Sequence, residues 1–365
     1  MAASRPVFTL FRSRVSMLSL RAALCLLPAC FLLAALPAPA WNDTGHMTVA
    51  ELAWRRLSAG ERGAITVLLR QHPHHALLAA NMPRSASDTN RWIFLRAATW
   101  PDMVRPSRDP SRPKPASITA FHHGDWHYTN APYVAPADVG AVHPPAHGEG
   151  KILAAIAANE ALLKDKTKPA PDRAVALCWL LHLYGDLHQP LHCVAWFSPE
   201  FPHGDRGGNS VLIRPLSAPV VLHSFWDDAL GSGESPMFID HTADTISNDP
   251  AHTNARLRKD LAHTSIRQWA EESVDAAEAF VYLEGRLKHI KAPVGGRSLA
   301  PSDEEMVPEA LVREGGAEPS PMAAAALAAS VPAVNAGYAT TAETIARRRA
   351  ALAGRRLGGL LRKLF

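Results

Sequence analysis

The sequence predicts a single-domain, all-α protein that carries one small β-hairpin. Apolar residues recur at three- and four-residue steps through much of the chain after residue 40, as they do on one face of a helix. Strand signals are few, and the clearest is the stretch 210–222, where two short apolar runs flank Pro215 and Pro219. No fixed-period repeat and no linker between compositionally distinct segments is evident. One domain over residues 41–365 is therefore the simplest organisation.

The first forty residues have the pattern of a secretory signal. Arginines precede an apolar run and a small-residue end, at Arg5, Arg12, Arg14 and Arg21, Ala22 to Leu36, and Ala38-Pro39-Ala40. A membrane anchor is the alternative, but the run is about fifteen residues long and a bilayer span needs roughly 20. We therefore expect cleavage after Ala40, a mature chain that begins at Trp41, a secreted or periplasmic location, and no stable membrane association.

Helical periodicity predicts the main elements of the mature chain. The segments are Val49 to Leu57, Ile152 to Leu163, Arg173 to Gly185, Asn254 to Lys291 and Thr340 to Leu364. We expect the fourth segment to break near Ser265 and the last near Gly354. The Pro-, Gly- and Ser-rich stretches 105–117 and 291–321 are interpreted as surface loops, and the second belongs to a loop-rich insertion, 291–332, within the domain.

Charge and cysteine content exclude two classes of protein. Four of the 38 Lys and Arg residues lie in the predicted signal, so the mature chain has 34 of them against 34 Asp and Glu residues. A broad basic surface, by which many nucleic-acid-binding proteins are recognised, is therefore not expected, and any attraction for phosphate must be local. Only Cys178 and Cys193 remain after cleavage, which excludes a disulfide scaffold but leaves open one bridge or two buried thiols.

Two histidine–aspartate pairs suggest a metal site. His182 and Asp186 are four residues apart in a predicted helix, so their side chains share one face, and His223 and Asp227 repeat this spacing. His192 follows the first pair, after Pro190 has ended the helix. One such pair alone is usually an ion pair on a helix surface, but two copies and a further histidine favour metal binding. Zinc suits the set because it binds imidazole nitrogen and carboxylate oxygen, and a catalytic zinc keeps one position for water.

Three upstream motifs, Trp41-x4-His46, Trp100-Pro101-Asp102 and Trp126-His127-Tyr128, extend the pattern. With them the chain resembles the zinc-dependent single-strand nucleases and 3′-nucleotidases of the S1/P1 type, which share a superfamily with bacterial zinc phospholipase C. The resemblance runs from Trp41 to the segment 353–357 and is weaker at 291–332. It implies the helical phospholipase C/nuclease-type fold, three zinc ions per chain, and hydrolysis of single-stranded DNA or RNA to 5′-phosphorylated products.

The resemblance also implies a ligand set in three groups. Trp41, through its free amine and carbonyl, His46 and Asp186 would hold one zinc; Asp102, His127, His182 and the same Asp186 a second; and His192, His223 and Asp227 the third. A close pair of cations lowers the pKa of a bridging water, and a third stabilises the leaving oxygen. Asp102 would also orient the attacking water, and Arg105 is similar to the arginine with which the family steadies phosphate. A solvated loop arginine is the alternative for Arg105.

The same resemblance suggests how the substrate is bound. Tyr128 occupies the place of the aromatic residue that stacks on a base, and Asn130 that of its polar partner. Fungal members often have an aspartate where this chain has Asn130, so base preference stays open. Asn209, in the turn Gly207-Gly208-Asn209, matches a family turn near the cleft, although this tripeptide is common in loops.

The remaining histidines and tryptophans receive structural interpretations. We expect His72, His74, His75, His143 and His147 to be exposed loop residues and His188 to hydrogen-bond to a metal ligand. Trp179, Trp196, Trp226 and Trp269 are expected to pack in the core or along cleft walls. The basic C-terminal segment 347–363 is expected to be a packed helix with a solvated basic face, in preference to a helix that binds membranes or nucleic acid.

Two other functions compete with the nuclease. A zinc phospholipase C is disfavoured because the similar phospholipases place their first histidine farther from the terminal tryptophan than His46 lies from Trp41, and have glutamate where this chain has Asp227. A non-catalytic exported zinc-binding protein is disfavoured because three ligands in the last group leave room for water and substrate. We therefore expect a monomeric enzyme that acts on single-stranded nucleic acid and nucleotides, with 3′-nucleotidase activity left open.

Overall fold

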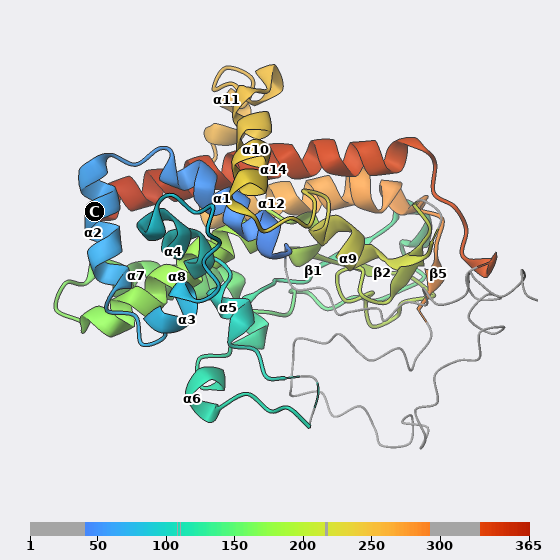
Figure 1. Ribbon diagram of the computed structural model, residues 1–365. Helices are drawn as coiled ribbons and strands as arrows, with labels where there is room; N and C mark the ends of the chain where they lie inside the picture. Colours follow the sequence, from blue (N-terminus) through green and yellow to red (C-terminus); the bar gives the residue numbers. More distant parts are fainter. Residues whose placement is uncertain (1–40, 108, 110, 216–217, 293–328) are drawn as a thin grey trace, which may run out of the picture.

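The structure is a computed structural model that describes residues 41–107, 109, 111–215, 218–292 and 329–365. The predicted signal 1–40 and most of the predicted insertion 291–332 lie outside the described residues. Within these ranges the chain is mostly helical, with two small sheets (Figure 1), which confirms the predicted fold class. None of the helices in the described ranges combines the length and apolar character that crossing a membrane requires.

Helices follow one another through most of the described residues. The helices are α1 (Asp43–Trp54), α2 (Ala59–Leu69), α3 (His75–Ala79), α4 (Thr89–Ala97), α5 (Trp100–Met103), α6 (Ala116–Thr119), α7 (Ile152–Lys164), α8 (Ala170–Asp186), α9 (Leu222–Asp227), α10 (Pro236–Asn248), α11 (Arg258–Leu261), α12 (Ile266–Ala276) and α14 (Gly337–Leu364). Short 3₁₀ or π turns are η1 (Gly124–Trp126), η2 (Pro136–Asp138), η3 (Pro190–His192), η4 (Pro250–His252), η5 (Ala277–Val281) and η6 (Leu283–Gly285).

Local sequence signals explain several helix boundaries. The side chain of Asn42 caps α1 by accepting a hydrogen bond from the Gly45 N–H at 3.0 Å. Ser58 and Ser265 open α2 and α12 with capping boxes that satisfy N–H groups at each helix start. Ser265 is the predicted break in the segment 254–291, and Pro190 follows the end of α8, so both predictions are confirmed.

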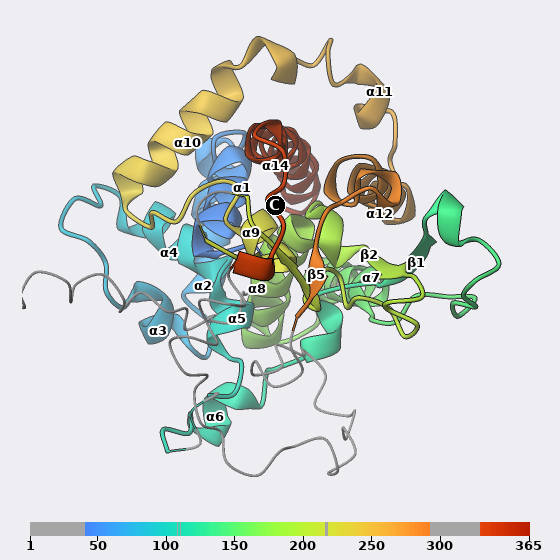
Figure 2. The same ribbon diagram turned by 90° about the vertical axis from the view of Figure 1, so that its right-hand side faces the viewer.

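The core forms where α14 packs against α1, α8 and α10, and where α7 packs along α8. In Figure 1 α14 lies alongside α1 and α12, and Figure 2 shows it nearly end-on among them. The predicted packing role of Trp179, Trp196, Trp226 and Trp269 is confirmed, since all four are buried. From Ala176 to Asp186, α8 is buried, and it supplies both core residues and, at its C-terminal end, the first His-x3-Asp pair.

The predicted break of the last helix at Gly354 is wrong, because α14 runs without interruption from Gly337 to Leu364. A Cβ atom on Gly354 would lie 2.4 Å from the Cβ atom of Leu52 in α1, so glycine here allows two helices to approach closely. The predicted packing of this helix is confirmed, but its basic face is only partly solvated. Arg349 and Arg356 are buried.

The predicted hairpin is confirmed. Strands β3 (Val211–Ile213) and β4 (Val220–Val221) pair antiparallel, and β5 (Ile290–Lys291) adds a third strand on the other side of β3. A second sheet was not predicted: β1 (Ala131–Val134) pairs in parallel with β2 (Val194–Phe197). Each of these strands has four residues and no alternating pattern, so the sequence signal is weak. The pairing nevertheless brings the segment after His127 beside the segment after His192.

Cys178 and Cys193 are both buried, and both are free thiols. Burial raises the pKa of each thiol, so both stay protonated at neutral pH. Of the two states that the sequence left open, the structure has two buried thiols.

Candidate metal centre

The predicted side-chain ligands converge from distant parts of the chain on one buried region. The contributing elements are α1 with His46, α5 with Asp102, the residue after η1 with His127, α8 with His182 and Asp186, η3 with His192, and α9 with His223 and Asp227. In both His-x3-Asp pairs the two side chains share one helix face, as their spacing predicts. The parallel strand pair then aligns the segments that follow His127 and His192.

Asp186 lies at the middle of this region and is fully buried. Its Oδ2 atom is 3.1 Å from His127 Nδ1 and 3.1 Å from His182 Nε2. Its Oδ1 atom is 3.4 Å from His46 Nε2 and 3.6 Å from His192 Nδ1. One carboxylate therefore contacts four imidazoles, and its two oxygens face different histidines.

Asp102 lies next to two of the histidines that contact Asp186. Its Oδ1 atom lies 3.7 Å from His182 Nε2 and 3.9 Å from His127 Nδ1. The half-buried Arg105, one turn further along, places a guanidinium nitrogen 2.7 Å from the same oxygen. The structure thus places Arg105 beside the predicted ligands and not in a solvated loop.

The third predicted group forms next to the other two. His223 Nε2 is 3.4 Å from Asp227 Oδ2, and His192 Nε2 is 3.8 Å from Asp227 Oδ1. The rings of His192 and His223 lie side by side, with centroids 4.9 Å apart. Because His192 contacts both Asp186 and Asp227, it joins the third group to the first two.

Backbone carbonyls determine which ring nitrogen carries the proton in the neutral form of three of these histidines. The Nδ1–H groups donate to backbone oxygens, from His182 to Ala98 at 2.8 Å, from His192 to His127 at 2.7 Å, and from His223 to Gly207 at 2.7 Å. A neutral imidazole whose Nδ1 carries the proton has its lone pair on Nε2. These Nε2 atoms face the carboxylates, so the rings are oriented as metal ligands usually are.

The donor atoms and their spacing fit zinc. In each of three groups, the ligand atoms lie within 4.8 Å of one another. The groups are His46, Asp102 and His182; His127, His182 and Asp186; and His192, His223 and Asp227. Two atoms that are each about 2.0–2.1 Å from a tetrahedral ion lie about 3.3 Å from each other, close to most of the distances above. Buried polar atoms without a hydrogen-bond partner include His46 Nε2, Asp186 Oδ1, His192 Nε2 and Asp227 Oδ2. Unsatisfied buried polar atoms are costly, and a cation would satisfy these.

The electrostatics keep Asp186 and His127 in their binding forms. Burial alone would lower the pKa of His182 and His192, but Asp186 raises it, so these two rings would release a proton on binding metal. Burial alone would raise the pKa of Asp186, but the protonated forms of His182 and His192 and the hydrogen bonds from His127 and protonated His182 hold the pKa of this carboxyl well below its usual range. Burial lowers the pKa of His127 to about 3, and the Arg105 charge acts in the same direction. Asp186 is therefore a carboxylate and His127 a neutral imidazole, which are the forms that bind metal.

Two local features bring α1 to this region. A Cβ atom on Gly185 would lie 2.8 Å from His46 Nδ1, so glycine between His182 and Asp186 gives the His46 ring room against α8. The buried Trp41 indole packs on Gly45, and the Asn42 N–H lies 3.4 Å from the Asp227 carbonyl oxygen. The predicted N-terminal residue thus packs on the residue before His46 and immediately precedes a residue that contacts the third group.

The candidate substrate-binding residues lie on two segments that border the ligands. Thr129 N–H donates to His192 O at 2.8 Å, which ties the segment with Tyr128 and Asn130 to the ligand turn. The half-buried Tyr128 ring rests on Gly150, where an added Cβ would lie 2.7 Å from the ring. Asn209 follows the carbonyl that binds His223, but its amide donates to Arg206 O at 2.9 Å.

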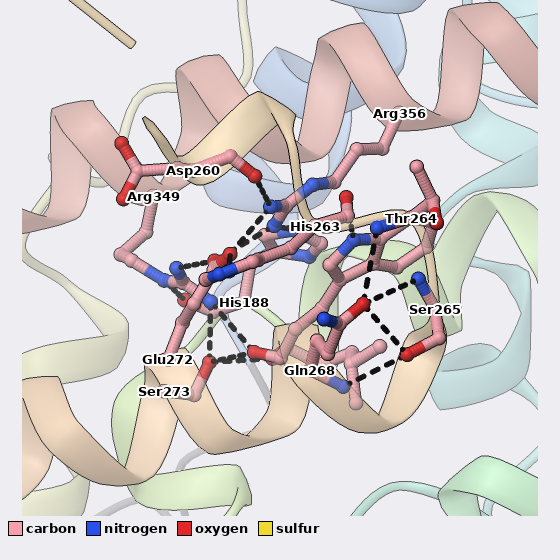
Figure 3. A network of polar contacts seen from close by, with 12 residues as sticks. His188, Asp260, His263, Thr264, Ser265, Gln268, Glu272, Ser273, Arg349 and Arg356 are labelled. Carbon is pink, nitrogen blue, oxygen red and sulfur yellow. Dashed lines mark hydrogen bonds and ion pairs between the residues drawn. The ribbon is translucent and has the colours of Figure 1, made fainter. Parts of the chain in front are cut away.

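His188 does not hydrogen-bond to a metal ligand, contrary to expectation. This fully buried ring donates from Nδ1 to Tyr184 O at 2.8 Å and accepts at Nε2 from Arg356 at 2.8 Å. Figure 3 shows the network it enters, in which Arg349 and Arg356 of α14 both contact Glu272 of α12, at 2.6 Å in each pair. The network fixes the turn after α8 against two other helices.

The prediction that His72 is an exposed loop residue is also wrong. His72 is buried against Trp100, with ring centroids 4.7 Å apart, and its Nδ1 accepts the His74 N–H at 3.0 Å. Burial lowers the pKa of His72 to about 3. His74 and His75 are half-buried and not exposed as predicted. His143 and His147 are exposed, which confirms the prediction for these two.

Sequence reasoning missed Gln189, which is fully buried between the ligands Asp186 and His192 and donates from Nε2 to Asp227 Oδ1 at 2.7 Å. Its position beside Pro190 suggested only the end of a helix. Nothing in the sequence shows that Asp227 returns to this turn.

Comparison with known proteins agrees with this geometry. The family model described as S1/P1 Nuclease matches residues 41–365. Endonuclease 4 of Arabidopsis thaliana is 22% identical over 269 residues, which cover 66% of this chain and 76% of that protein. Endonuclease 3 of Arabidopsis thaliana is 40% identical over 55 residues, which cover 15% of this chain and 16% of that protein. Since the family model matches the chain from Trp41 to its last residue, this protein belongs to the S1/P1 nuclease family.

Proposed function

We propose that this nuclease is an exported, zinc-dependent enzyme that hydrolyses single-stranded DNA and RNA to products with 5′-phosphates. The single observation that carries the proposal is the position of Asp186, a buried carboxylate within 3.6 Å of four imidazoles. Such a cluster of neutral imidazoles and carboxylates is typical of zinc sites. Membership of the S1/P1 nuclease family supports nucleic acid as the substrate.

Three zinc ions would be held by the residues that the sequence suggested. Their ligands would be Trp41, His46 and Asp186; Asp102, His127, His182 and Asp186; and His192, His223 and Asp227. When bound, the ions would supply Lewis acidity, lower the pKa of water and neutralise charge on phosphate oxygens. They would also provide the local attraction for phosphate that a formally neutral mature chain otherwise lacks.

Two residues of the chain would act on the reacting groups directly. Asp102, whose side chain is only 9% exposed at the edge of the cluster, would accept a hydrogen bond from the attacking water and orient it toward phosphorus. Arg105, held at 2.7 Å by Asp102, would donate to the non-bridging phosphate oxygens through its planar guanidinium. Their contact means that the water-orienting and phosphate-binding groups fix each other.

The same geometry supports activity on phosphate monoesters. A terminal 3′-phosphate presents the oxygens that Arg105 and the ions would bind in a diester, so we include 3′-nucleotidase activity in the proposal. Cleavage after Ala40 would leave Trp41 as the N-terminus and so create the amine of the first zinc site. We propose that the mature enzyme acts as a monomer in the periplasm or outside the cell.

Replacing Tyr128 by alanine is expected to weaken the binding of single-stranded substrate by about 1–3 kcal/mol, because a stacking surface for one base is lost. The loss should appear mainly in KM for oligonucleotides, with zinc content unchanged. Tyr128→Phe, which keeps the ring, is the matched control and should behave nearly as wild type. Equal losses in both variants would mean that the hydroxyl acts and the ring does not stack.

The proposal is tested by expressing the full chain with export and purifying it without chelator. The sample is examined for its N-terminal residue, for zinc per chain by elemental analysis, and for hydrolysis of single-stranded DNA, RNA and phosphatidylcholine. We expect Trp41 at the N-terminus, three zinc ions, and cleavage of nucleic acid that chelation abolishes. Hydrolysis of lipid with nucleic acid left intact would instead identify a phospholipase C. A zinc-loaded protein without either activity would identify a non-catalytic zinc-binding protein.

A further inference from the structure

The side chain of Gln189 makes two hydrogen bonds in the protein interior. Its Nε2 donates to Asp227 Oδ1 at 2.7 Å, and its Oε1 accepts the N–H of Leu191 at 2.5 Å. Gln189 is fully buried and Asp227 nearly so. The amide therefore connects the turn after α8 with α9, two elements that are far apart in the sequence.

The Leu191 contact determines which way the amide points. A backbone N–H can only donate, so the atom that faces Leu191 must be the amide oxygen. The NH₂ group must then face Asp227, where it can only donate to a carboxylate. The bond to Asp227 Oδ1 thus follows from the chemistry of both partners and not from an arbitrary choice of amide orientation.

This bond makes the two oxygens of Asp227 unequal. Oδ1 is occupied by Gln189, whereas Oδ2 is buried without a hydrogen-bond partner and lies 3.4 Å from His223 Nε2. Oδ1 also lies 3.8 Å from His192 Nε2, but it already accepts the Gln189 bond, so Oδ2 is the Asp227 oxygen that remains without a partner in the third ligand group. A carboxylate without such a donor could turn about its Cβ–Cγ bond and present either oxygen or both.

We infer that Gln189 is a positioning residue that presents a single oxygen of Asp227 to the metal ion of the third group. The inference rests on the proposed metal centre, but it concerns how this chain's own residues shape it. Groups that hydrogen-bond to metal ligands typically contribute about 10–100-fold to metal affinity or activity. Gln189 would do so for the ion bound by His192, His223 and Asp227.

The backbone around Gln189 is held rigidly enough for this role. Its own N–H donates to Asp186 O at 3.0 Å. The two preceding carbonyls are bound from outside the turn, Leu187 O by Ser273 Oγ at 2.7 Å and His188 O by Arg349 Nε at 3.2 Å. Figure 3 shows Ser273 and Arg349 in the network that surrounds His188. Since the turn is fixed between α12 and α14, the Gln189 amide cannot follow Asp227 if that side chain moves.

A purely structural role is the alternative, because the Leu191 bond alone would cap η3. That role would not affect which oxygen of Asp227 is free, so zinc content and ligand geometry separate the two interpretations. Gln189→Met keeps the length of the side chain but can neither donate to Asp227 nor accept from Leu191. Gln189→Asn keeps an amide that is one methylene shorter, so it cannot reach both partners, and serves if the methionine variant does not fold.

The experiment compares wild type, both Gln189 variants, Asp227→Asn and Asn159→Leu in the full exported chain. Asn159 is a buried amide in α7 that donates to Ala155 O at 2.8 Å, so its replacement controls for the loss of a buried hydrogen bond away from the site. Each protein is checked for folding by circular dichroism. Zinc is then titrated into the metal-free protein, and the visible spectrum of the cobalt-substituted form is recorded.

We expect both Gln189 variants to bind the ion of the third group about 10–100-fold less tightly than wild type. Their cobalt spectra should change in the direction that Asp227→Asn produces, while Asn159→Leu should match wild type in both readouts. Folded Gln189 variants with wild-type zinc affinity and an unchanged cobalt spectrum would overturn the inference. If wild type itself bound no zinc, the proposed function would be wrong. If wild type bound zinc and the Gln189 variants bound it equally well, only this inference would be wrong.

Discussion

Replacing Asp186 by asparagine is expected to lower the rate of nucleic-acid hydrolysis by about 10³-fold or more, because two of the proposed zinc sites would lose their shared ligand. Asp186 is fully buried and contacts His46, His127, His182 and His192 together. An asparagine amide carries no charge, and its NH₂ group cannot bind a cation. The zinc content should fall by up to two ions per chain. Steady-state kinetics and elemental analysis of the same sample measure both effects.

Glu160→Gln is the matched control for this substitution. It also exchanges one carboxylate for an amide on a neighbouring helix, and the amide oxygen can still accept the hydrogen bond that Tyr184 donates at 2.8 Å. We expect this variant to keep its zinc and its activity. A normally active, fully zinc-loaded Asp186→Asn protein would show that Asp186 does not bridge two ions.

Removing zinc with a chelator is expected to abolish activity and to lower the melting temperature substantially. A ligand present at a hundred times its Kd stabilises the folded state by about 2.7 kcal/mol for each site, so three sites contribute roughly 8 kcal/mol. For a chain of this size that corresponds to a fall in Tm on the order of 15 °C. The physical reason is that stripping the ions leaves buried atoms such as Asp186 Oδ1 and Asp227 Oδ2 without partners.

Adding metal back to the stripped protein tests the chemistry of the site. Zinc should restore both activity and Tm, whereas Mg²⁺ at the same concentration should restore neither, because the cluster offers mostly imidazole nitrogen and Mg²⁺ requires oxygen ligands. Differential scanning calorimetry and a single-stranded DNA assay on the same samples give both readouts. A stripped protein with unchanged Tm and activity would contradict a resident metal centre.

The sequence by itself determined the fold class and the residue types of the candidate metal centre. Helix periodicity is a local property, and so is the spacing that places His182 with Asp186 and His223 with Asp227 on single helix faces. The preference of zinc for imidazole and carboxylate is a property of the residues themselves. The roles of Trp41, Tyr128 and Asn130 came from resemblance, because a single aromatic or amide has no local signal of its function.

The tertiary structure alone decided which groups meet. That Asp186 contacts four histidines, and that Asp227 accepts from Gln189, depends on how α1, α5, α8 and α9 converge, which no local pattern encodes. Gly354 looked like a helix break because glycine disfavours helices, yet close packing against Leu52 outweighs that preference. His72 looked exposed because its neighbours are loop residues, but the Trp100 ring covers it. In each case the deciding energy comes from contacts between segments far apart in the sequence, and these exist only once the chain has folded.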